Sequence, residues 1–519
     1  MRGTGLATRS ASDLNVGTLG GFRASVKTPP VLSLLLLAAL AGCGPAPFQV
    51  SSDASGSISV AGRPGSSPFI AFLDLSGPTI GDVTSVTYSV QPRAGSVSKP
   101  VQATFSISAL QTRGYVAETG KLTVPVFGLY PGAQNQATVG LQFSDASSQL
   151  VHVQITTETY EDPHAVYDHA TILQPRAPGS TLGFDFFAMK STLDSVVVVD
   201  TDGMVRWVGN GTPSQAVIFD NGGFVVGSQS SAQFQRLELD GTSTGGQVGD
   251  PAVLDFTHNI DPGKSGFLAE FDITGDADAT VEEITRDGAV LASWKMGDVL
   301  SAYMSAHGDD PTTFVRPGVD WFHVNAATYD PSDDSMIVSS RENFVIKLDY
   351  TSGEPIWILG DPTKYWYTFP SLRAKALTLA EGGFYPIGQH ATSITADGRL
   401  MLFNDGAASL NQPDGAPPGD SRNFSVVSAY AIDPVAMTAQ EVWRFEHQPD
   451  LQSSFCSSSY EVGQTYLVNY AMATGGTTTR LLGLDSNRQV VFDFSYPNPG
   501  GCQTSWNAVP VPFDDLQFQ

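Results

Sequence analysis

The sequence predicts an all-β protein, in which a six-bladed β-propeller follows a small antiparallel β-sandwich. Glycine (52 of 519 residues) and proline (33) are frequent, and only 15% of the residues are charged, which is typical of short strands joined by turns. Alternating β runs with turn signals fill residues 70–160. A turn with Asp then recurs at Asp200, Asp240, Asp287, Asp349, Asp433 and Asp485, and in five of these six copies an aromatic residue follows in the next strand. Six irregularly spaced copies of one unit favour a propeller with inserted loops.

The first 43 residues of the sequence predict that the protein is exported from the cytoplasm. An apolar run of eleven residues, Val31–Ala41, follows Arg23 and Lys27 and ends at Leu-Ala-Gly-Cys43. The run is shorter than the roughly 20 residues that span a bilayer, but it suits an export signal. Residues 1–42 are therefore predicted as a signal peptide with a lipobox, and Cys43 as a lipid anchor that holds a periplasmic or cell-surface lipoprotein. Plain secretion or a buried helix is the alternative.

Three further segments follow from composition and patterning. Residues 43–68 are rich in Ser and Gly and predict a flexible tether, residues 69–160 the β-sandwich, and residues 170–519 the propeller. Besides Cys43, the chain has only Cys456 and Cys502, a pair that could form a disulfide in an oxidising compartment. The net charge of −25 argues against a nucleic-acid partner, and the predicted membrane contact is through the lipid anchor alone.

Three of the eight histidines share one position in the repeat. His258, His323 and His390 each stand nine to thirteen residues before an apolar strand. Equal positions in neighbouring blades converge on the central channel, so these imidazoles are expected to meet. Three histidines suit either a Zn²⁺ site or acid–base and nucleophilic chemistry. Arg341, which ends a strand after His323, would repel a metal ion and attract a sulfate or phosphate, unless it only pairs with Glu342.

The residues around these histidines closely resemble bacterial aryl-sulfate sulfotransferases. The resemblance is carried by Asp320–Asn325 (DWFHVN), by Asp330–Arg341 (DPSDDSMIVSSR) and by Gly388–Ala391 (GQHA). It implies a six-bladed propeller behind a small sandwich. It also implies a ping-pong transfer of sulfate from a phenolic ester to a phenol, with neither a nucleotide sulfate donor nor a metal or other cofactor.

The resemblance also implies roles for single residues. His390 would be the nucleophile that is transiently sulfated, and His323 and His258 would act as acid or base. Arg341 would bind the sulfuryl oxygens and Asn325 would orient them. The family's cysteine pair before the nucleophile is absent here. Ser458, at the same position of the sixth blade, offers a hydroxyl for sulfate. An apolar mouth for the phenol is expected at residues 365–369 or 384–385.

Other functions fit the sequence less well. A non-catalytic propeller lipoprotein that binds a ligand or protein would not need three histidines and Arg341 together. A quinoprotein-like dehydrogenase would need a shell of carboxylates at the repeat position where histidines stand. A sulfatase would need a C/S-x-P-x-R pattern, which the sequence lacks.

Overall fold

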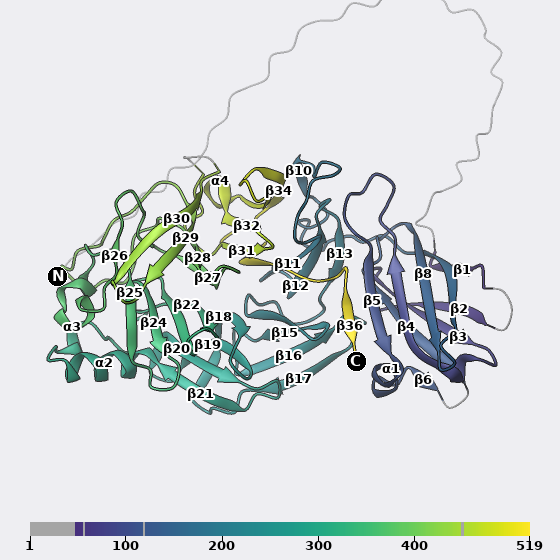
Figure 1. The fold of residues 1–519 in the computed structure, drawn as a ribbon, viewed down its shortest axis with the longest axis horizontal. Helices are drawn as coiled ribbons and strands as arrows, with labels where there is room; N and C mark the ends of the chain where they lie inside the picture. Colours follow the sequence, from purple (N-terminus) through teal and green to yellow (C-terminus); the bar gives the residue numbers. More distant parts are fainter. Residues whose placement is uncertain (1–46, 55–57, 118–119, 448–450) are drawn as a thin grey trace, which may run out of the picture. The chain divides into compact units, whose positions relative to one another are not determined.

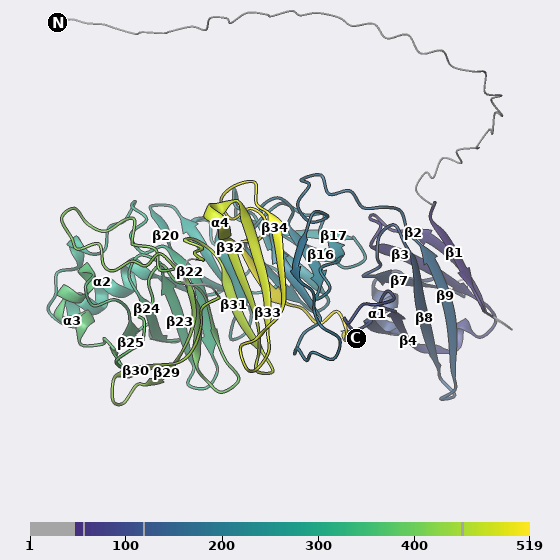
Figure 2. The ribbon, with the colours of Figure 1, turned by 90° about the horizontal axis from the view of Figure 1, so that it is seen from above.

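Two antiparallel sheets formed mainly by the first part of the chain lie over one shared core. The computed structural model describes residues 47–54, 58–117, 120–447 and 451–519. The larger sheet has the order β1 (Gln49–Ser52), β9 (Ser148–Thr156), β8 (Gln134–Phe143), β4 (Val83–Val90), β5 (Val101–Ser106) and β36 (Leu516–Phe518). The smaller has the order β2 (Ser59–Pro64), β3 (Ile70–Ser76), β7 (Lys121–Phe127) and β6 (Val116–Ala117). Figure 2 shows both sheets from above.

The core between these sheets follows from alternation along the strands. In β4, Val86, Tyr88 and Val90 are buried, and the residues between them are not. Because successive side chains of a strand point to opposite faces, β4 gives the core every second residue, whereas β3 and β7 are buried on both faces over most of their length. Strands β3, β7, β8 and β9 contribute to the same hydrophobic cluster. Two sheets packed in this way make a β-sandwich.

Two strands lie within the segment predicted as a tether, residues 43–68, which corrects that prediction. β1 pairs with β9, and β2 pairs with β3. A side chain on Gly62 would come within 2.2 Å of Val50, so glycine here permits β1 and β2 to approach closely. The predicted signal peptide and the anchor Cys43 lie outside the described residues.

Six further sheets are formed between residues 171 and 510, and we number them I to VI. Sheet I is β35 (Asn507–Pro510), β11 (Phe186–Lys190), β12 (Val196–Asp200) and β13 (Val205–Val208). Sheet II is β14 (Val217–Asp220), β15 (Gly223–Gly227), β16 (Gln233–Glu238) and β17 (Ser243–Gln247). Sheet III is β18 (Val253–Pro262), β19 (Phe267–Ile273), β20 (Asp276–Ile284) and β21 (Val290–Lys295).

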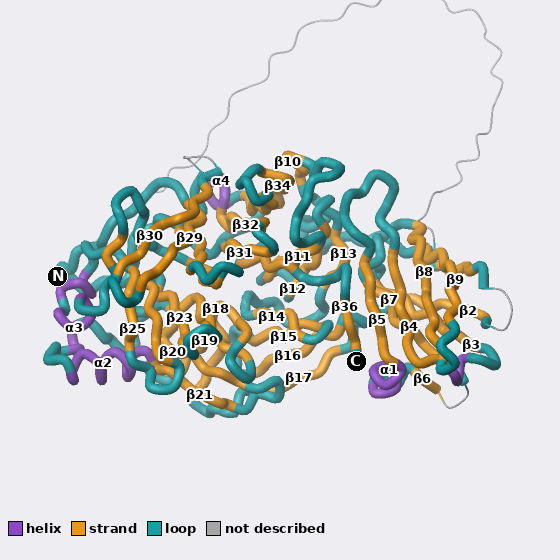
Figure 3. The backbone as a smooth tube through the Cα atoms, in the orientation of Figure 1, coloured by secondary structure: helices purple, strands orange, loops and turns teal. Residues whose placement is uncertain are grey.

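The other three sheets have the same plan. Sheet IV is β22 (Val324–Asp330), β23 (Ser335–Ser340), β24 (Val345–Asp349) and β25 (Pro355–Leu359). Sheet V is β27 (His390–Ile394), β28 (Leu400–Asn404), β29 (Val426–Asp433), β30 (Thr438–Phe445) and β26 (Thr378–Leu379). Sheet VI is β31 (Ser458–Val462), β32 (Thr465–Met472), β33 (Thr478–Leu484), β34 (Val490–Pro497) and β10 (Thr171–Gln174). The prediction of a mainly β protein is confirmed, and Figure 3 shows how strands predominate.

The aspartate turns predicted from the repeat fall at one place in every sheet. Each lies at the hairpin between the third and fourth strands named above. The carboxylates of Asp240, Asp349 and Asp485 accept hydrogen bonds from backbone N–H groups two or three residues further on, at 2.8 to 2.9 Å. Such local bonds stabilise a turn, which explains why aspartate recurs there.

The first strand of each sheet as named above, which we call its leading strand, contacts the next. The contacts run from β14 to β18, then to β22, β27, β31 and β35. In Figure 1 the leading strands that are labelled, β18, β22, β27 and β31, lie on the inner side of their sheets. The start of each leading strand is therefore close to the starts of its neighbours.

The remaining elements are short. They are η1 (Ile80–Asp82), α1 (Ile107–Thr112), α2 (Met296–Ala306), η2 (Pro311–Thr313), η3 (Tyr365–Thr368), α3 (Pro370–Arg373) and α4 (Ala473–Gly476). None of the described helices has the length and hydropathy needed to cross a bilayer. The last strand, β36, was expected within the propeller (170–519) but pairs in parallel with β5 of the first sheet.

Candidate active site

The three predicted histidines belong to three successive leading strands, His258 in the middle of its strand and the other two at the start of theirs. His258 lies in β18, His323 directly precedes β22 and His390 opens β27. The strand register is interrupted at each place, between Phe256 and Ile260, between Val324 and Ala326, and between His390 and Ser393. Such bulges turn a side chain out of the regular pleat and are frequent beside active sites. At His323 the backbone has a φ of 52°, in the left-handed region.

These histidines form one cluster. The ring centroids of His258 and His323 are 4.8 Å apart. Burial, reinforced by the neighbouring charges of His323, His390 and Arg341, holds the pKa of His258 well below 6.5. His258 and His390 are buried, whereas 21% of the His323 side chain is exposed. The cluster is therefore deep but opens to solvent at His323.

Arg341 brings a positive charge with free donors into this cluster. It follows β23, and its backbone N–H donates to the carbonyl of His323 at 3.0 Å. Its Nη1 donates to Glu342 at 2.7 Å, whereas its buried Nε and Nη2 have no partner among the described residues. Nε and Nη2 lie on one edge of the guanidinium, and such an edge binds two oxygens of one anion side-on. Pairing with Glu342 was the alternative role predicted for Arg341. This pairing uses only one of the three guanidinium nitrogens.

The contacts of His390 define its tautomer. Its Nδ1 lies 3.0 Å from the carbonyl oxygen of Gly388, which can only accept, so Nδ1 carries the proton. The backbone N–H of Cys456 points at Nε2 from 3.3 Å, so Nε2 must be the acceptor. Burial, followed by the charges of Arg341 and His323, lowers the pKa of His390 well below 6.5. His390 is thus a neutral imidazole whose Nε2 carries no proton and, within the described part of the chain, accepts only the backbone N–H of Cys456.

Asp405 supports that arrangement. Its Oδ2 lies 2.6 Å from Nδ1 of His390, at the end of the neighbouring strand β28. The carboxyl is fully buried, and burial raises its pKa well above 3.8. A carboxyl group in this position fixes the ring and stabilises any positive charge that develops on the imidazole.

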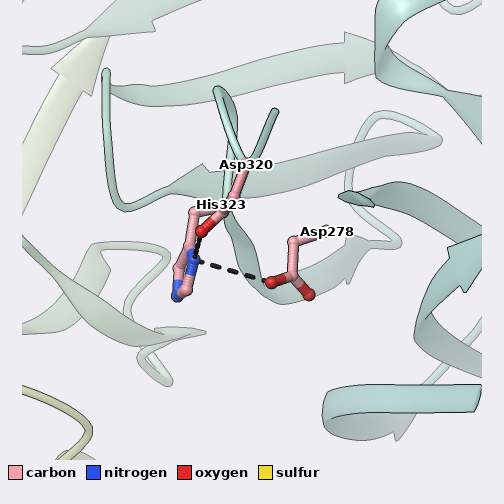
Figure 4. Close-up of side chains that lie close together, drawn as sticks. All are labelled: Asp278, Asp320 and His323. Atoms are coloured by element: carbon pink, nitrogen blue, oxygen red, sulfur yellow. Dashed lines mark hydrogen bonds and ion pairs between the residues drawn. The ribbon is translucent and has the colours of Figure 1, made fainter. Parts of the chain in front are cut away.

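His323 is held by two carboxylates (Figure 4). Its Nδ1 lies 2.7 Å from Asp320 and 3.7 Å from Asp278. Burial opposes the charged form of His323, but these two carboxylates outweigh it and raise the pKa of the imidazole above 6.5. Burial likewise raises the pKa of Asp278 to about 7. The ligand atoms of these three residues lie within 4.8 Å of one another, so among the described residues they are the group that could hold a metal ion.

Two predicted substrate-binding residues have structural partners. The amide of Asn325 donates to the carbonyl of Gln389 at 2.8 Å, which ties β22 to the residue before His390. The hydroxyl of Ser458 is fully buried and bonds both backbone groups of Ala508 in β35. These contacts support a positioning role for Asn325. Within the described part of the chain, Ser458 has no contact with the histidine cluster.

Cys456 and Cys502 are joined by a disulfide beside the cluster. The bond links the segment that precedes β31 to the segment that precedes β35. It thereby holds the N–H of Cys456 near His390. Cys456 and Ser457 both have positive φ, at 62° and 77°, which is uncommon for residues with a side chain.

Sequence reasoning missed the carboxylates Asp278, Asp320 and Asp405. Asp320 stands three residues before His323 and could have been found from that spacing. Asp405 follows His390 by fifteen residues and meets it only through the pairing of β27 with β28. Asp278 comes from the neighbouring sheet III, so no local pattern connects it with His323.

The structure has distant neighbours among solved proteins. A dihydro-heme d1 dehydrogenase NirN matches with a TM-score of 0.30 and 11% identity, over 82% of this chain and 75% of that one. The β-propeller domain of Myceliophteria thermophila Cps50 (Swd1) matches with a TM-score of 0.33 and 13% identity, over 62% and 88%. TM-scores of this size do not define the fold of this chain.

Two relatives share more of the sequence. An arylsulfate sulfotransferase AssT of Escherichia coli O6:H1 is 30% identical over 230 residues, which are 40% of this chain and 34% of the relative. The arylsulfate sulfotransferase AssT of Lelliottia amnigena is 28% identical over 228 residues, 41% of this chain and 34% of the relative. The matched region thus spans about a third of each relative.

Family models match both parts of the fold. Residues 65–160 match the arylsulfotransferase Ig-like domain, and residues 169–506 match the arylsulfotransferase (ASST) family. The second match includes all three histidines of the cluster and Arg341. The chain belongs to the arylsulfotransferase family.

Proposed function

We propose that this protein transfers a sulfuryl group from an aryl sulfate to a phenol, through a sulfated His390. One observation carries the proposal: the buried edge of Arg341 offers two N–H donors without a partner among the described residues, in the same cluster as a neutral imidazole whose unprotonated Nε2 accepts only a long bond of 3.3 Å from the backbone N–H of Cys456. A sulfate ester supplies what this arrangement lacks, namely an anion with several acceptor oxygens and an electrophilic centre. A divalent metal ion would face the positive charge of Arg341 instead.

In the first half-reaction, the Nε2 electron pair of His390 forms a bond to sulfur while the bond between sulfur and the aryl oxygen breaks. The leaving phenoxide takes the electron pair of the broken bond and a proton from His323. By analogy with phosphoryl transfer, the transition state is loose, so positioning and charge stabilisation dominate catalysis. Arg341 holds the sulfuryl oxygens throughout, and Asp405 balances the charge on the His390 ring.

In the second half-reaction, a phenol gives its proton to the now neutral His323. The phenol oxygen forms a bond to sulfur, and the bond between sulfur and Nε2 breaks, which returns the electron pair to His390. Because the first phenol leaves while the sulfuryl group stays on His390, and the second phenol reacts only afterwards, the route is ping-pong. The chemistry needs only side chains of this chain, without a nucleotide sulfate donor.

We also infer that sheets I to VI are the six blades of a propeller. The contacts between successive leading strands support this inference. It is further supported by the position of the aspartate turn, which is the same in all six sheets. The histidines would then line the central channel from blades III, IV and V.

To test the transfer, the full chain is mixed with 4-nitrophenyl sulfate, and both the release of nitrophenol and the mass of the protein are measured. Without a phenol we expect a single burst of nitrophenol and a protein mass increased by one SO₃ unit, which peptide mapping places on His390. Adding phenol should give continuous nitrophenol release and an equal amount of phenyl sulfate. Continuous release without phenol would instead show a hydrolase, and an adduct on another residue would exclude His390 as the nucleophile.

The burst should depend on pH in a defined way. His390 must be neutral, and since its pKa is lowered, activity should be lost only well below pH 6.5. His323 must be protonated for this step. Since its pKa is raised above 6.5, the rate should fall only when the pH rises through this raised pKa. The pH dependence should be measured as the burst of phenol from phenyl sulfate instead of 4-nitrophenyl sulfate. The phenoxide that leaves phenyl sulfate is more basic than nitrophenoxide, so its departure needs the proton of His323.

Asp320→Asn tests the origin of the alkaline limb. The substitution removes the negative charge that raises the pKa of His323 and leaves at most a weaker, neutral hydrogen bond, so the alkaline limb should move to lower pH while the acid limb stays. The control is Asp397→Asn, which removes an exposed carboxylate paired with Arg399. An alkaline limb at the same pH in Asp320→Asn and wild type would contradict the role of His323.

A further inference from the structure

The leading strands of sheets VI and I bring aromatic residues to the place where sheets III, IV and V bring histidines. Phe455 and Cys456 precede β31, and Trp506 directly precedes β35, as His323 directly precedes β22. One side of the site is thus formed by imidazoles and the other by two aromatic rings.

Both rings contact the cluster. The Phe455 ring lies under the guanidinium of Arg341, with 4.7 Å from Cζ to the ring centroid. The Trp506 ring lies 5.6 Å from that of His258. Both side chains are only half-buried, so part of each ring surface remains free to contact a ligand.

The two aromatic residues are held in one rigid unit. The disulfide between Cys456 and Cys502 joins their segments, and the backbone N–H of Ser457 donates to the carbonyl of Trp506 at 3.0 Å. The hydroxyl of Ser457 also accepts from the backbone N–H of Ala471 at 3.1 Å. The two rings therefore keep a fixed relation to His390, whose Nε2 the same segment contacts through Cys456.

The aromatic residues expected at the mouth from the sequence have other roles. Trp366 is fully buried in a hydrophobic cluster against which Tyr365, Tyr367 and Phe369 pack. Phe384 stacks with Arg444 at 3.9 Å and with Arg422 at 4.9 Å, and Tyr385 packs on another cluster. None of these contacts involves a residue of the histidine cluster.

We propose that Phe455 and Trp506 form the subsite for the aromatic ring of the donor and, in the second half-reaction, of the phenol acceptor. The proposal rests on the sulfuryl transfer proposed above. With the sulfuryl oxygens on the free edge of Arg341, the ester's ring lies next to Phe455, because that ring already stacks on the guanidinium. The subsite selects planar aromatic groups, since stacked ring pairs gain stabilisation beyond their buried area.

Binding to the full chain tests this subsite without turnover. His390→Asn serves as the background so that the donor is not consumed, and calorimetry measures the Kd of 4-nitrophenyl sulfate and of inorganic sulfate. Phe455→Leu and Trp506→Leu should each raise the Kd of 4-nitrophenyl sulfate roughly three- to tenfold. Inorganic sulfate should bind as before, because it uses only Arg341 and the histidines. The ring-retaining changes Phe455→Tyr and Trp506→Phe should keep most of the affinity.

Phe384→Leu is the matched control, because it removes a ring that stacks on arginines elsewhere and should change neither Kd. The proposal is overturned if both leucine variants bind 4-nitrophenyl sulfate as tightly as the background does. It is equally overturned if the leucine variants lose as much affinity for inorganic sulfate as for 4-nitrophenyl sulfate. The two rings would then only support the anion site. A selective loss of the aryl ester supports the subsite even if wild-type protein transfers no sulfate, which separates this result from failure of the proposed function.

Discussion

His390→Ala is expected to abolish sulfuryl transfer. The substitution removes Nε2, the atom proposed to form the bond to sulfur, and the methyl group that replaces the ring cannot form that bond. Removing the nucleophile of a covalent mechanism costs on the order of 10⁴-fold or more in kcat. The burst of nitrophenol and the SO₃ adduct should disappear together, whereas binding of inorganic sulfate should persist because Arg341 is unchanged.

The control for this variant is His152→Ala. His152 lies in β9 with an exposed side chain that bonds Thr138, far along the chain from the cluster. It should retain full transfer activity. If His390→Ala still released nitrophenol in proportion to added phenol, the sulfuryl group would pass directly between donor and acceptor. In that case the ping-pong route would be wrong, although the family assignment would stand.

The sequence predicted those features that depend on local chemistry. An aspartate at a tight turn satisfies backbone N–H groups a few residues away, so the turns at Asp240, Asp349 and Asp485 were visible without a structure. The shared position of the three histidines in the repeat was visible for a similar reason. Once each repeat forms one sheet, similar positions in the sequence fall on the leading strands of successive sheets.

Features that depend on strand pairing or on side-chain packing could not be predicted in this way. Asp405 reaches His390 only because β28 pairs with β27. Trp506 and Phe455 are 51 positions apart, and although the cysteine count allowed the disulfide that joins their segments, no local pattern places it beside the histidines. Composition also misled: glycine and serine near Gly62 indicated a tether, whereas the strands there need glycine for close contact with Val50.

Arg341→Lys is expected to lower kcat/KM by roughly 10²- to 10³-fold, which is typical when an oxyanion loses a preorganised donor. Lysine keeps the charge and can still pair with Glu342, so the fold should not be left with an unpaired buried carboxylate. An ammonium group has no flat edge, however, and cannot hold two sulfuryl oxygens in one plane as Nε and Nη2 do. The charge is thus conserved while the geometry of the anion site is lost.

Two measurements separate the contribution of the charge of Arg341 from that of its flat edge. They are kcat/KM and the inhibition constant of inorganic sulfate. If the side-on contact matters mainly in the transition state, kcat/KM should fall much more than the affinity for sulfate, because a loose transition state spreads its charge over the equatorial oxygens. Arg399→Lys, at an exposed arginine paired with Asp397, is the control and should leave both values unchanged. Equal kcat/KM in Arg341→Lys and wild type would mean that charge alone suffices. The two unpartnered nitrogens of Arg341 would then not be the feature that fits this site to a tetrahedral anion.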